Sequence, residues 1–143
     1  MDIGAAVAEQ RGLATTLFDT LRQDGLDEPG VTRDPYGAGE QRAHVTITAA
    51  AQRLGLRIEH DAAANLYMTL SGRDPAAKRI VVGSHLDSVP HGGNFDGAAG
   101  VVAGLVAVAA LQRLGITSSG PCRNRMARRP AAGSPVRLRR GEP

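Results

Sequence analysis

The chain has 143 residues, enough for one domain or a piece of a larger one, and a formal net charge of +3. Residues 1–117 carry 10 basic and 13 acidic side chains, whereas residues 118–143 carry seven arginines and one acidic residue, so the basic excess lies entirely in the last segment. The single cysteine excludes an internal disulfide framework, and no apolar run reaches the ~18–20 residues of a membrane-spanning helix. The N-terminus lacks the basic region of a signal peptide, so we expect a cytoplasmic protein.

Two helices are predicted in the first third of the chain. Over 10–23, apolar side chains recur at spacings of three and four, which places them on one face of a helix. A second helix is predicted over 40–54, ending at Gly55. Its buried side is expected to include Val45, Ile47, Ala50 and Leu54.

Three strands and a third helix are predicted next. Residues 56–60 alternate apolar and polar like a half-buried strand, and 65–70 form a second candidate. Residues 79–84 are a short apolar run, typical of a central strand covered on both faces. The apolar segment 97–114 is expected to be a buried helix. This order predicts an α/β sheet covered by helices, and three strands are few because sheets usually have about five or six.

The loop between the last predicted strand and the last predicted helix holds the candidate site. Active sites of open α/β sheets lie at the carboxyl ends of strands, where this loop must be. His85 and Asp87 are two residues apart and share a face if the strand extends that far. A metal-binding histidine needs its second ring nitrogen held, often by a carboxylate. Asp96 precedes the helix, and a tight path that brings it near His85 is permitted by Gly92, Gly93 and Gly97.

Each of these residues also has a purely structural interpretation. A His-x-Asp pair is short enough to arise by chance, and an aspartate before a helix is by default an N-cap. His91 in a glycine-rich loop is expected to be solvated. His44 and His60 are assigned to a helix surface and a strand edge, with no functional role.

The segment IVVGSHLDSVPHGGNFDGAAGVVAGLVAVAAL, residues 80–111, closely resembles the metal-dependent amidohydrolases related to aminoacylases and zinc carboxypeptidases. It is most similar to the branch of N-carbamoyl-L-amino-acid hydrolases, beta-ureidopropionases and allantoate amidohydrolases. Residues 30–33 and 64–68 support the likeness, which covers roughly residues 12–117. The resemblance implies an N-terminal part of a zinc-peptidase-like α/β catalytic domain, with helices packed on an incomplete sheet.

The resemblance also implies roles for individual residues. His85 matches a ligand of one metal, Asp96 matches the carboxylate that bridges two metals, and Asp87 matches the acidic residue supporting His85. The two divalent ions are usually zinc, with manganese, cobalt or nickel in some members. A metal-bound water would attack a carbamoyl, amidino or amide carbon and split a linear C–N bond of a small-molecule substrate. Members of the family are homodimers, and neither a nucleic acid nor a membrane is implied as a partner.

The family pattern continues beyond the segment that this chain matches. A further strand, an acidic pair containing the general base, a second histidine ligand and a dimerisation domain would follow. After Thr117 this chain has Glu142 as its one acidic residue and no histidine. Since even one catalytic zinc normally takes three protein ligands, we expect the chain as given to be inactive.

Residues 118–143 are expected to form an Arg/Pro-rich disordered tail distinct from the domain part at 1–117. The chain has 16 arginines and one lysine, which is consistent with GC-rich coding DNA, and the tail is interpreted as frameshifted or as a mis-called gene end. The nucleotide sequence around codon 117 decides this. The alternative is a non-catalytic binding protein whose basic tail contacts a nucleic acid or a membrane.

Overall fold

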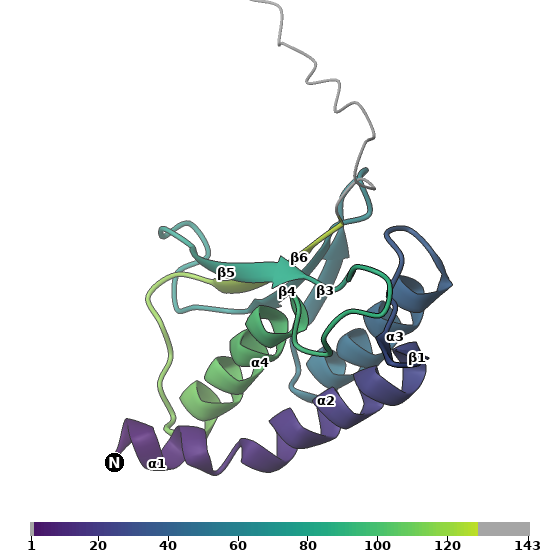
Figure 1. Cartoon of the computed structure of the whole chain (residues 1–143). Coiled ribbons are helices and arrows are strands. Elements are labelled where there is room, and N and C mark those ends of the chain that lie inside the picture. The colour runs from purple at the N-terminus through teal and green to yellow at the C-terminus, as the bar shows by residue number, and fades with distance from the viewer. Residues whose placement is uncertain (1, 129–143) are drawn as a thin grey trace, which may run out of the picture.

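The computed structural model of the chain describes residues 2–128. Within that range, helices lie on one side of a mixed sheet (Figure 1). The helices are α1 (Ile3–Ala8), α2 (Arg11–Gly25), α3 (Ala38–Arg53) and α4 (Ala98–Arg113). The strands are β1 (Leu26–Asp27), β2 (Gly30–Val31), β3 (Arg57–His60), β4 (Leu66–Leu70), β5 (Ile80–His85) and β6 (Cys122–Ala127).

The main sheet has the strand order β3-β4-β6-β5. β3 and β4 form an antiparallel pair, β4 and β6 are antiparallel, and β5 and β6 are parallel. α4 connects the two parallel strands, as a crossover between parallel neighbours requires. The carboxyl ends of β5 and β6 therefore lie side by side, with His85 opposite Ala127.

A largely aliphatic core fills the space between the helices and one face of the sheet. α2, α3 and α4 contribute the buried residues Leu21, Ile47 and Leu105, and the sheet contributes Met68 and Met126. Buried side chains recur at helical spacing on α2, α3 and α4 and at alternate positions of β4 and β6, so the inward faces of these elements are removed from water. This burial holds the sheet and its site loop against α4.

The predicted α/β architecture and its helices are confirmed, with ends shifted by a few residues. The prediction that Val45 is buried is wrong, because its side chain is 61% exposed. α3 packs through Ala43, Ile47 and Ala50, which follow one another at three- and four-residue spacing. Val45 stands two residues before Ile47, roughly opposite on the helix, and so faces solvent.

The prediction of a central strand at 79–84 is also wrong for the described residues. β5 is an edge strand of this sheet, and Ile80 and Val81 are 61% and 59% exposed. A continuous apolar run indicates a strand whose two faces can both be buried. Whether other elements cover those faces depends on the rest of the fold.

The segment expected to be an irregular tail contains an interior strand, which corrects that prediction for 122–127. β6 pairs with β4 on one side and with β5 on the other, so its backbone groups complete both ladders. Asn124 and Met126 point into the core, and the Asn124 side-chain amide donates a hydrogen bond to the Val101 carbonyl at 3.0 Å. The remainder of the predicted tail, 129–143, lies outside the described residues. No helix among residues 2–128 is long and apolar enough to cross a membrane.

Candidate active site

The candidate site is the loop that connects β5 to α4. It begins at the carboxyl end of β5, where the neighbouring parallel strand β6 also ends. Ligand sites of open α/β sheets are commonly found at this edge, because the strand ends leave a crevice there. His85 closes β5, Asp87 follows it in the loop, and Asp96 lies just before α4.

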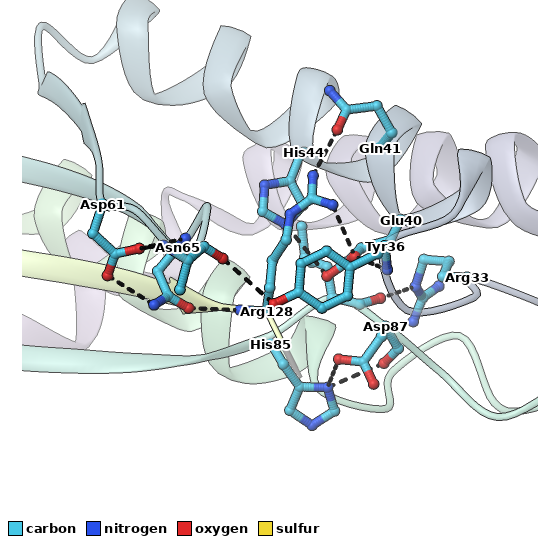
Figure 2. Close-up of polar contacts among 12 residues, drawn as sticks. Arg33, Tyr36, Glu40, Gln41, His44, Asp61, Asn65, His85, Asp87 and Arg128 are labelled. Atoms are coloured by element: carbon cyan, nitrogen blue, oxygen red, sulfur yellow. Dashed lines mark hydrogen bonds and ion pairs between the residues drawn. The ribbon is translucent and has the colours of Figure 1, made fainter. Parts of the chain in front are cut away.

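His85 and Asp87 form a pair, as their spacing predicts (Figure 2). The His85 Nδ1 atom lies 3.0 Å from the Asp87 backbone carbonyl and 3.0 Å from the Asp87 carboxylate Oδ1. Both side chains are largely buried, at 18% and 12% exposure. The Asp87 carbonyl, with its carboxylate close by, thus holds the Nδ1 side of the imidazole.

Gly97 brings the start of α4 against the His85 ring. Its φ is +61°, and a Cβ built on it would lie 2.5 Å from His85 Nδ1. Any side chain at this position would therefore displace the ring. Gly97 is also the N-cap of α4, and no side chain caps the helix, so Asp96 does not have the N-cap role that its position allowed.

Arg33, two residues after β2, holds the loop together. Its side chain is fully buried. Nε donates to the Leu86 carbonyl at 2.6 Å, and one terminal nitrogen donates to the carbonyls of Asn94 and Asp96 at 3.2 and 3.1 Å. The Arg33 backbone amide donates to the Ser88 hydroxyl at 3.0 Å, and the Ser88 backbone amide donates to the Arg33 carbonyl at 2.9 Å. One side chain therefore spans the loop from its beginning to its end.

The charge of Arg33 is balanced by two carboxylates of the candidate site. Burial lowers the pKa of the Arg33 guanidinium, and the charges of Asp96 and Asp87 oppose that shift. Both carboxylates are therefore close enough to Arg33 to interact with it electrostatically. Sequence patterns had indicated His85, Asp87 and Asp96 but had not assigned Arg33 a role, although it belongs to the 30–33 segment that supported the resemblance.

The remaining histidines lie apart from this group. His91 is about half exposed, and its Nδ1 lies 3.1 Å from the Asp27 carbonyl, so the loop is attached to the β1–β2 hairpin. His60 is exposed at the end of β3. The prediction that His44 lies on a helix surface is wrong: it is buried, with Nε2 3.6 Å from Glu40 Oε1 on the preceding turn of α3.

The donor set fits only part of a metal site. Asp87 holds the Nδ1 side of the His85 ring, and Gly97, the neighbour of Asp96 in the chain, packs against that ring. However, residues 2–128 contain no group of three or more histidine, cysteine, aspartate or glutamate side chains that could hold a metal ion. A catalytic zinc site normally needs three protein ligands, so the described residues do not form a complete one.

The fold and this loop define a partial mixed α/β domain of the kind found in amidases and peptidases. The crystal structure of a hydantoinase/carbamoylase family amidase from Burkholderia ambifaria matches with a TM-score of 0.74 and 32% identity, over 80% of this chain and 28% of that one. The crystal structure of AtUAH in complex with glyoxylate matches with a TM-score of 0.76 and 25% identity, over 80% and 27%.

Sequence comparison agrees with the structural likeness. The N-carbamoyl-L-amino acid amidohydrolase of Geobacillus stearothermophilus is 41% identical over 92 residues, which is 64% of this chain and 22% of that protein. Residues 65–125 match the model of Peptidase family M28, so the match reaches into β6. The chain belongs to the M28-family amidohydrolases, in their hydantoinase/carbamoylase branch. It spans about a quarter of the length of these relatives.

Proposed function

We propose that this chain is the part of an amidohydrolase that supplies the first metal ligands, in an enzyme that splits linear C–N bonds of N-carbamoyl amino acids or ureido compounds. The observation that carries the proposal is the His85–Asp87 pair packed against Gly97. The named activity of the Geobacillus stearothermophilus relative supports the substrate class.

In this proposal His85 and Asp96 hold the metal ions, and Asp87 acts through His85 as a positioning residue. The ions are divalent, with zinc as the first choice and manganese, cobalt or nickel as alternatives. When bound, such ions lower the pKa of a water and polarise the substrate oxygen. The chain's own contribution is to orient the His85 ring through Asp87 and to fix the loop through Arg33.

We also propose that the chain on its own does not turn over substrate. The carboxyl end of β6 lies beside His85, and the residue after β6 is Arg128. Arg128 contacts Glu40 at 3.3 Å and Gln41 at 2.6 Å (Figure 2). No aspartate, glutamate or histidine occurs between Thr117 and Arg128 to complete the donor set or to accept the proton of an attacking water.

A chimera tests the assignment of the site. Residues 1–117 of this chain would replace the matching N-terminal part of the Geobacillus stearothermophilus enzyme, and ammonia release from N-carbamoyl-L-amino acids would be measured with each divalent metal. We expect the chimera to be active and His85→Ala or Asp96→Ala to reduce its rate at least about a hundredfold. Asp87→Ala should lower metal affinity by about ten- to a hundredfold.

His60→Ala is the matched control, since His60 is exposed on β3, the edge strand opposite β5, and the rate should be unchanged. Retention of full activity in the His85→Ala chimera would refute the site. Turnover by the unmodified 143-residue chain would refute its proposed inactivity.

A further inference from the structure

One face of the main sheet is turned away from the helices (Figure 1), and several arginines of β3 and β6 lie on it. Met68, Asn124 and Met126 point to the core, so their strand neighbours point away from it. The strand pairing aligns these outward residues in two rows across the sheet. The first row is Arg57, Thr69, Arg123 and Val81, and the second is Glu59, Tyr67, Arg125 and Gly83.

A hollow of about 270 Å³ opens on this face at the end of the first row. Three guanidinium groups, from Arg57, Arg79 and Arg123, line it together with the hydroxyl-bearing residues Thr69 and Ser71. Arg57 and Arg123 flank Thr69 on adjacent strands, and Arg79 immediately precedes β5. The hollow therefore gathers donors from every strand of the main sheet or its flanking residues.

Arg123 is held in place before any ligand arrives. Its Nε donates to Thr69 Oγ1 at 3.2 Å, a terminal nitrogen donates to Glu59, and its guanidinium lies 4.4 Å from the centre of the Tyr67 ring. Arg57 lies 3.3 Å from the same Glu59 carboxylate. Glu59 is thus paired with two of the three arginines that line the hollow, which leaves an excess of positive charge around it.

We propose that this hollow binds a compact anion with two or more negative charges, of phosphate or polycarboxylate type. Guanidinium groups match the oxygen geometry of both classes. The size of the hollow suits a small molecule, and Arg123 covers the Tyr67 ring, so the ring does not offer a stacking surface to the bases of a nucleic acid. The site lies on the outward sheet face and is independent of the proposed amidohydrolase function.

Calorimetric titration of the full chain with pyrophosphate and, separately, with citrate tests the proposal at low salt. Arg79→Gln should weaken binding of the preferred probe about fivefold, and the double variant Arg57→Gln/Arg79→Gln more strongly. Arg22→Gln removes the same charge from the exposed last turn of α2 and should change affinity less than twofold. Circular dichroism of each variant confirms that the sheet is retained, and the stronger of the two probes identifies the ligand class.

Equal weakening in Arg22→Gln and Arg79→Gln would overturn the proposal, since binding would then follow net charge alone. Lack of binding of both probes at millimolar concentration would overturn it as well. Tighter binding of a single-stranded oligonucleotide than of pyrophosphate, with the same dependence on Arg57 and Arg79, would also overturn the proposal. The ligand would then be an extended polyanion and not a compact anion.

Discussion

Arg33 contacts residues that lie more than fifty positions after it in the sequence. Its guanidinium and backbone contact Leu86, Ser88, Asn94 and Asp96. A guanidinium stays charged and carries five donors in a planar fork, so one side chain can satisfy several carbonyls whose hydrogen bonds to water are lost on burial. Gly97 acts at the other end of the loop, where the absence of a side chain lets α4 approach His85.

Gly97→Ala should lower the free energy of unfolding by about 2 kcal/mol, because alanine is strained at positive φ and its Cβ would collide with the His85 ring. Urea titration measures the change. Gly93→Ala is the matched control in the same loop, since nothing lies within 4 Å of a Cβ built there. Equal stability of the two variants would contradict the close approach.

Asp61 should make stability depend on pH in the acid range. Hydrogen bonds from the Asn65 side chain and amide, from Tyr67 and from Ala63 lower the pKa of Asp61 from 3.8 to about 2. A carboxylate with a depressed pKa in the folded state stabilises the fold above its unfolded pKa, and this stabilisation is lost as pH falls from about 4 to about 2.

Thermal melts of the chain and of Asp61→Asn between pH 5 and pH 2 measure this contribution. The melting temperature of Asp61→Asn should fall less steeply over that interval. Asp2→Asn serves as a control for the removal of one carboxylate elsewhere. Parallel pH profiles for all three proteins would rule out the contribution of Asp61.

At the scale of elements, the two edges of the main sheet differ. β3 has four residues, Arg57–His60, of which three are charged or titratable, whereas β5 has six and begins with Ile80, Val81 and Val82. Charged, short edge strands resist pairing with other chains, and apolar ones promote it. β5 is therefore the edge at which this chain should associate.

Val81→Lys should reduce self-association at micromolar concentration, as measured by sedimentation velocity. Val45→Lys is a matched control, since it introduces the same charge at a valine of similar exposure on α3, 61% against 59%. If both variants reduce association equally, added charge rather than the β5 edge is responsible.

The carboxyl end of β6 is attached to α3 through Arg128, the residue that follows the strand. Arg128 donates its backbone amide to Asn65 Oδ1 at 2.8 Å, and its guanidinium lies 3.3 Å from the buried Glu40. Burial raises the pKa of Glu40, but His44, the Tyr36 amide and Arg128 together lower it below its ordinary value. A buried carboxylate of this kind is stable only because cationic and N–H partners compensate its desolvation.

For the molecule as a whole, β6 joins two parts of the sheet. Removal of residues 118–143 would leave β4 and β5 without the strand that they share. We expect this truncated chain to lose its cooperative thermal transition, whereas a chain ending at Arg128 keeps every strand described and should melt cooperatively. Circular dichroism melts distinguish the two, and identical cooperative melts would contradict a structural role for β6.

The hypothesis of a frame change near Thr117 stays a prediction about the coding DNA. The arginines of β6 occupy the outward positions of a strand whose inward positions are Asn124 and Met126. An alternative frame that encodes a strand followed by an acidic pair would support the hypothesis, and the absence of such a frame would reject it.

The sequence alone predicted the three long helices and the strands β3, β4 and β5, though not α1 or the β1–β2 hairpin. It also indicated the candidate residues His85, Asp87 and Asp96. These signals are local: apolar periodicity, and a long motif between a strand and a helix. Only the tertiary structure decided the role of Arg33, the contact of Gly97 with His85 and the interior position of β6. Arg33 is separated from its partners by 53 to 63 residues in the sequence. β6 forms because β4 and β5 both pair with its backbone. Contacts of that range leave no periodic trace in the segments that make them, so they appear only when the chain is folded.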